Sequence, residues 1–111
     1  MIEGNFLSVA QITAMVTTDP SGLLAQIRNG SLKATCLTFA AELCGKIKGA
    51  DPEVLKALKI VLRHPKPEVR EGALYGLANL GTPEAIDLIR SAESDVDEDV
   101  RNVAEEILDP L

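Results

Sequence analysis

The chain repeats a helix–turn–helix unit, and this repetition limits its fold more than any other feature. Shifting the sequence by 31 residues places Val69 on Val100 and Ala73 on Ala104, and shifting it by 37 places Leu32 on Val69. Three columns are apolar or small in every copy: 32/69/100, 36/73/104 and 40/77/108. Self-similarity of this kind is typical of solenoids, in which each unit buries its apolar face only against its neighbours.

The clearest copy of the unit spans residues 65–94. Four apolar residues of its first half share one face of a helix with period 3.6: Val69, Ala73, Leu77 and Leu80. Gly81 suits the position after a helix, Thr82 can cap the next one, and Pro83 is tolerated in a first helical turn. No β-rich run bounded by turns occurs, so the sequence predicts an all-α protein.

The pattern of this copy resembles HEAT repeats. It reads Pro-x-Val-Arg-x-x-Ala-Leu-x-x-Leu-x-x-Leu-Gly and then Pro-x-Ala-Ile-x-x-Ile. It is most similar to the short variety first noticed in phycobilisome lyases, because its spacing is below the roughly 40–47 residues usual for HEAT units. The likeness covers residues 30–108 well and 5–29 weakly. The tetratricopeptide pattern is absent, and the ankyrin signature is matched only at Thr82-Pro83.

Repetition and resemblance together predict an all-α fold, an α-solenoid forming a right-handed superhelix of about three and a half helix pairs. A single domain over 1–111 is expected, with approximate units 5–29, 31–63 and 67–94 and a capping helix over 98–108. Ser31 and Asp51 are the expected caps of the third and fourth helices, the latter with Pro52 at the first helical position and an end at Arg63.

The two ends of the array differ in character. The first helix, expected over 5–17, is apolar around much of its circumference, whereas a solenoid end normally has a polar outer face. Its outer side either docks on a partner or a second copy, or Phe6 and Met15 fold back over the first repeat. At the other end, Glu105 and Glu106 occupy positions that would face a following repeat, which favours a C-terminal cap.

Charge and composition exclude several classes of function. The net charge is −6, with +2 over residues 1–65 and −8 over 66–111, and the chain has no Trp, so nucleic-acid binding is disfavoured. No membrane span or targeting signal is recognisable. Cys36 and Cys44 lie about 12 Å apart along one expected helix, too far for a disulfide, and indicate reduced thiols in a cytoplasmic protein.

Catalytic and metal-binding patterns are incomplete. Asp95, Asp97, Asp99 and Glu106 have the spacing of a calcium loop, but Val100 replaces the glycine required at its sixth position, which favours an acidic N-terminal cap instead. His64, the only histidine, lacks partners for a zinc or nucleophilic site, and the His-Glu pairs of HEAT-type hydroxylases do not occur. The sequence therefore predicts no catalytic residue, no cofactor and no metal.

Basic residues recur in two places. Lys33, Arg70 and Arg101 follow the first apolar column and are interpreted as structural, pairing with acids or carbonyls between repeats, although a surface role is an alternative. The second helices carry one basic residue per repeat and two flanking ones: Arg28, Lys59 and Arg90, with Lys56 and Arg63. Because second helices line the concave side of HEAT-like arrays, these five are the candidate partner-binding residues. The alternative is that they are ordinary solvated positions.

These features predict a non-catalytic protein–protein interaction module, a scaffold, adaptor or regulatory partner. It would bind an acidic helix or tail through its concave face, or a partner through its N-terminal end, where a homodimer is also open. The alternative is a cofactor lyase or enzyme-maturation subunit resembling phycobilin lyases. The basic side chains could then hold cofactor propionates, although only Tyr75 and two Phe offer stacking rings.

Overall fold

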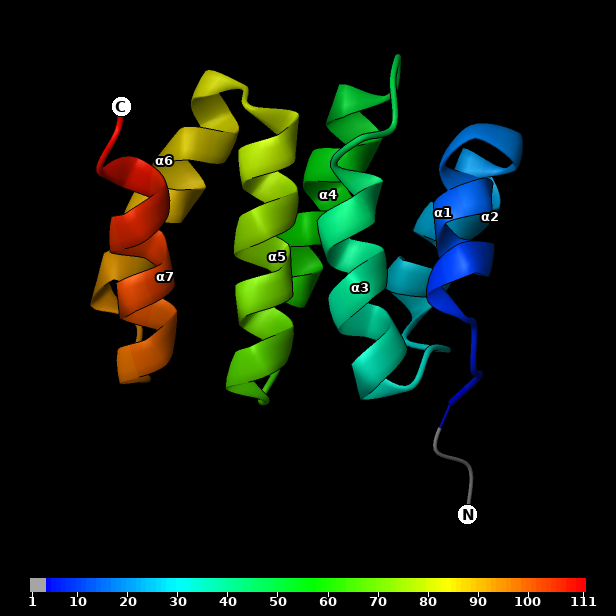
Figure 1. Ribbon diagram of the computed structural model, residues 1–111, viewed down its shortest axis with the longest axis horizontal. Helices are drawn as coiled ribbons and strands as arrows, with labels where there is room; N and C mark the ends of the chain where they lie inside the picture. The colour runs from blue at the N-terminus through cyan, green and yellow to red at the C-terminus, as the bar shows by residue number, and fades with distance from the viewer. Residues whose placement is uncertain (1–3) are drawn as a thin grey trace.

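The structure is a computed structural model that describes residues 4–111. Its elements follow one another as helices joined by short turns (Figure 1): α1 (Val9–Thr18), α2 (Pro20–Asn29), α3 (Ala34–Cys44), α4 (Asp51–Val61), α5 (Pro67–Leu80), α6 (Pro83–Ser91), the short 3₁₀ helix η1 (Ala92–Ser94) and α7 (Glu98–Leu108). Within the described residues the only extended pairing is an isolated bridge between Asn5 and Leu32.

The helices form two layers. The first helix of each pair lies in one layer, so that α3 packs between α1 and α5, and α5 packs between α3 and α7 (Figure 1). The second helices α2, α4 and α6 lie behind them, and α7 stands without a following partner in residues 4–111. The shortest dimension is 20 Å, about twice the diameter of a helix. The all-α solenoid predicted from the sequence is confirmed.

Several helix ends differ from their predicted positions because tertiary contacts decide them. α1 begins at Val9 rather than at residue 5, since Ser8 forms a capping box with Gln11 and the chain before it is extended beside Leu32. The same bridge delays α3 to Ala34, so Ser31 does not cap it.

The fourth helix also differs in its ends. Asp51 lies inside α4, after Ala50, rather than at the cap, and the helix ends at Val61 rather than at Arg63. The turn between α5 and α6 matches its prediction: Gly81 has a φ of 68°, and Thr82 accepts a hydrogen bond from the Ala85 N–H.

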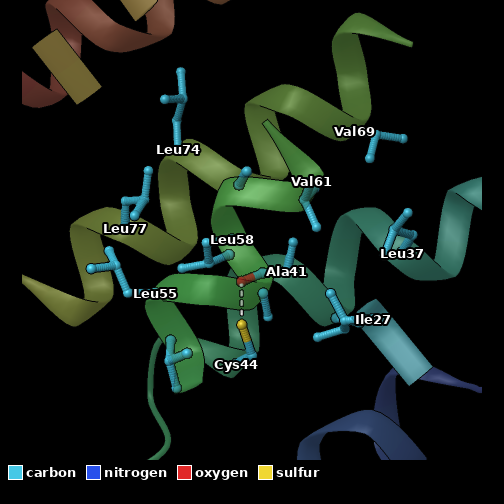
Figure 2. Packing of buried hydrophobic residues seen from close by; sticks show 14 of the residues in the cluster. Ile27, Leu37, Ala41, Cys44, Leu55, Leu58, Val61, Val69, Leu74 and Leu77 are labelled. Carbon is cyan, nitrogen blue, oxygen red and sulfur yellow. Dashed lines mark hydrogen bonds between the residues drawn. The ribbon is translucent and has the colours of Figure 1, made fainter. Parts of the chain in front are cut away.

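The core is a continuous aliphatic strip between the two layers. The three repeat columns are buried in every copy except at Leu108, which is half-buried. Figure 2 shows the side chains of α3, α4 and α5 meeting at Leu58, with Cys44 among them. Burial raises the pKa of Cys44 to about 12, and its thiol donates a hydrogen bond to the Ala41 carbonyl at 3.2 Å. Both cysteines are buried and free, as predicted.

The closest helix contact is the seam between α3 and α5. A Cβ placed on Gly72 would lie 2.5 Å from the Thr38 carbonyl oxygen, and one on Gly76 would collide with the Ala41 carbonyl oxygen. Asn79 reinforces the seam by donating from Nδ2 to the Glu42 carbonyl at 3.0 Å. The two glycines therefore bring the backbones of α3 and α5 into direct contact.

Candidate protein-binding surfaces

Arg70 is buried and links two neighbouring repeats through hydrogen bonds. Its Nε and Nη2 donate to the two carboxylate oxygens of Asp95 at 3.0 and 2.9 Å, and its Nη1 donates to the carbonyls of His64 and Pro65. Arg101 binds the same segment, because its Nη1 donates to the Asp95 carbonyl at 2.8 Å. The structural role predicted for Arg70 and Arg101 agrees with these bonds. For Lys33 the described residues provide no such partner, so its role stays a prediction.

The acidic segment before α7 caps that helix. The Asp97 carboxylate accepts hydrogen bonds from the N–H groups of Asp99 and Val100, and the Asp95 carboxylate accepts one from the Asp97 N–H. These bonds engage the Asp95 and Asp97 carboxylates at the start of α7, in agreement with the acidic N-terminal cap predicted there. Across residues 4–111, no group of three or more His, Cys, Asp or Glu side chains could hold a metal ion.

His64 lies in the loop between α4 and α5. Its Nδ1 accepts a hydrogen bond from the Lys66 N–H at 3.0 Å. Burial lowers the pKa of His64 below its ordinary value, and the nearby charges of Lys66 and Arg70 lower it further. This environment favours the neutral imidazole as a local acceptor that shapes the loop, in agreement with its interpretation as a loop histidine.

All five candidate partner-binding residues are exposed, but only two of them share a hollow. Lys56 and Lys59 line a groove of about 280 Å³ between α4 and the start of α6, here called the α4–α6 groove. Its other lining residues are Asp51, Pro52, Leu55, Thr82 and Glu84. A second hollow of about 230 Å³ shares Lys59 and Glu84 with the first and adds Asp87 and Leu88, and the name α4–α6 groove covers both hollows. Arg28, Arg63 and Arg90 do not line either hollow.

The α4–α6 groove has walls of opposite charge. Lys56 and Lys59 stand on the α4 side together with Asp51 at the start of α4, while Glu84 and Asp87 stand on the α6 side. The α4 wall is therefore basic on balance, and the α6 wall is acidic. The prediction from the sequence included only the basic side chains. The acids opposite them could not be predicted, because their position depends on how α6 packs beside α4. Leu55 and Leu88 supply apolar surface between the walls, and no aromatic residue lines the groove.

A second surface lies at the N-terminal end of the array. Seven residues, here called the N-terminal patch, surround an apolar pocket of about 200 Å³: Phe6, Leu7, Ser8, Val9, Thr35, Cys36 and Phe39. Of the two residues that one alternative folded back over the first repeat, Met15 packs against the core, whereas Phe6 is 68% exposed. Phe39 of α3 is 46% exposed. The sequence analysis placed Phe6 in the first helix, whereas it lies in the extended segment before α1. The position of this patch could therefore not be predicted from the helical pattern.

Carboxylates gather on the layer of first helices around Tyr75. Burial raises the pKa of Tyr75 above its ordinary value, and the negative charges of Glu106, Glu71 and Glu42 raise it further. The pKa of Glu71 is also raised, first by burial and then by neighbouring acids, among them Asp99. This layer is therefore acidic, and its carboxylates come from α3, α5 and α7.

Helix pairs stacked in two layers, each held by its neighbours, define an α-solenoid of helix-pair repeats. A family model described as HEAT repeats matches residues 20–109, and the chain belongs to the HEAT-repeat family. HEAT repeats generally mediate protein–protein interactions and are typically non-catalytic.

Neither the curated proteins nor the solved structures provide a match to this chain. The family match does not test the likeness to the phycobilisome-lyase variety of repeat. Within residues 4–111, every helix is too short or too polar to cross a membrane.

Proposed function

We propose that this protein is a non-catalytic scaffold or adaptor that binds a segment of another protein in the α4–α6 groove. The observation that carries this proposal is the groove itself, which has an apolar floor between two charged walls on the second helices. A floor of Leu55 and Leu88 offers the desolvated centre that protein interfaces require, and the charged walls form a polar rim.

The two walls restrict the partner. A wholly acidic segment would gain from Lys56 and Lys59 but would be repelled by Glu84 and Asp87 across the groove. The better occupant is an amphipathic helix whose acidic edge faces α4, whose apolar stripe meets Leu55, and whose opposite edge is neutral or basic. This refines the acidic helix or tail expected from the sequence. A cytoplasmic location, expected from the reduced cysteines, stays a prediction.

The proposal is tested by reversing the charge of one wall. Proteins retained by the immobilised wild-type chain are compared with those retained by the Lys56→Glu/Lys59→Glu variant, and the affinity of a purified partner is then measured by calorimetry. We expect affinity to fall at least about tenfold, because the partner's acidic edge would face two carboxylates.

The matched control is the Arg28→Glu/Arg90→Glu variant. It changes the net charge equally at exposed positions on second helices that lie outside the groove. Equal loss of binding in both variants would show a general charge effect, and unchanged binding in the groove variant would rule out the groove as the binding site.

A further inference from the structure

The N-terminal patch has no role in the proposed function, and its lining differs in chemistry from the charged walls of the α4–α6 groove. Its lining residues carry no charged side chain, and Phe6, Val9 and Phe39 are respectively 68%, 48% and 46% exposed. Exposed aromatic and aliphatic groups that surround a hollow are typical of a protein-binding surface, since burying them removes a large apolar area from water.

The outward face of α1 continues this uncharged character. Every exposed residue of α1 is apolar or neutral: Val9, Ala10, Gln11, Thr13, Ala14, Thr17 and Thr18. Over residues 4–39, which include both segments of the patch, the only charged residues are Asp19, Arg28 and the half-buried Lys33. The HEAT match begins at residue 20, so α1 and the patch segment before it are added to the matched repeats at this end.

We propose that the N-terminal patch and the outward face of α1 are a self-association surface, through which two copies of the chain pair about a two-fold axis. In such a contact each residue near the axis meets its own counterpart, so a charged residue there would face a like charge. The described surface of α1 contains none. Each copy also supplies both a protruding Phe6 and a hollow beside Phe39, so the two surfaces can exchange these groups reciprocally.

The charge distribution selects this arrangement over the head-to-tail one. Stacking the C-terminal end on the patch would place the exposed Glu105 and Glu106 of α7 against a lining that contains no charged side chain, which costs desolvation energy. A two-fold pairing at the N-terminal ends instead keeps the residues 66–111, with their net charge of −8, away from the contact. The occupant favoured by these charges is therefore a second copy in the reversed orientation.

The first test is sedimentation equilibrium of the wild-type chain from about 1 µM to about 500 µM, a range that brackets dimers of ordinary affinity. We expect a dimer whose dissociation constant rises at least about tenfold in Phe39→Ser and in Phe6→Ser. Ile60→Ser is the matched control, because Ile60 is 48% exposed on α4, away from the patch. A wild-type monomer throughout this range would overturn the proposal and leave the patch to another partner or chain segment. A dimer unaffected by both patch variants would also overturn it.

A second test does not depend on removing apolar groups. Thr13→Cys places a thiol on the outward face of α1, and Val96→Cys places one at a 93% exposed site before α7. Under mild oxidation we expect a covalent dimer from the Thr13 variant at a rate at least tenfold above the Val96 variant. Equal rates would contradict the two-fold pairing. The patch shares no residue with the α4–α6 groove, so either proposal can fail while the other stands.

Discussion

At the scale of single residues, the Arg70–Asp95 pair shows how a repeat position becomes a structural joint. The two side chains are 11% and 16% exposed and are joined by two hydrogen bonds, while Arg70 also binds two backbone carbonyls. The pair therefore fastens the loop before α5 to the loop before α7. Arg70 was predictable as structural because its position recurs in the repeat. Its partner was not, because Asp95 lies outside the aligned columns.

Replacing Asp95 with Asn tests this joint and has a defined pH dependence. We expect a loss of about 2–4 kcal/mol in the free energy of unfolding at pH 7, because Arg70 keeps its charge in a buried site without a carboxylate. Hydrogen bonds from Arg70 lower the pKa of Asp95 below its ordinary value. The wild-type advantage is therefore complete above the unfolded-state pKa, about 4, and is lost as the pH falls through the lower folded-state pKa.

Urea unfolding of the wild-type and Asp95→Asn chains at several pH values between 7 and 2.5 would measure this effect. Glu93→Gln is a suitable control, since Glu93 is an exposed acid two residues away. A stability difference that stays constant down to the lowest pH would contradict the role given to the Asp95 carboxylate.

At the scale of elements, the glycines of the α3–α5 seam set the distance between two helices. Gly76→Ala is expected to lower the free energy of unfolding by about 1–3 kcal/mol, because its new Cβ would collide with the Ala41 carbonyl oxygen, a backbone atom that cannot move aside. Helix propensity alone favours Ala by about 1 kcal/mol, so a stabilised variant would contradict the seam. Thermal or urea unfolding measures whether the free energy of unfolding falls or rises. Gly72→Ala provides an independent second measurement.

The repeat columns predicted core positions in the three aligned copies, all of them buried except Leu108, because the repetition carries that information directly. It did not predict where α1 and α3 begin, since the pairing of Asn5 with Leu32 depends on residues 27 positions apart in the chain. The candidate site was predicted only in part for a similar reason. Lys56 and Lys59 were found by their spacing, whereas Glu84 and Asp87 lie opposite them only once α6 is placed beside α4.

At the scale of the whole molecule, a stack held by neighbour contacts has stability that varies along its length. Within the layer of first helices, α3 and α5 each pack against a helix on both sides, whereas α1 packs only against α3 in the part of the chain that the structure describes. In dilute solution we expect the amides of α3 and α5 to exchange with deuterium at least about tenfold more slowly than those of α1. Exchange followed by mass spectrometry measures this, and uniform protection across the helices would contradict it.

The same experiment at higher protein concentration connects the two proposed surfaces. If two copies pair through α1, its amides gain protection with concentration while those of α6 do not. A paired molecule would also carry two α4–α6 grooves. A partner with two matching segments would then bind with an effective concentration set by their separation, more tightly than either groove alone.

The glycine seam also determines how the array can bend. On one side, the backbones of α3 and α5 touch at Gly72 and Gly76 and resist compression. On the other side, α4 and α6 are separated by the open groove. We therefore expect a change in the curvature of the array to alter the width of the groove more than the distance between α3 and α5. A segment bound in the groove would fix that curvature. Binding on one face would then also fix the relative position of the two ends of the array.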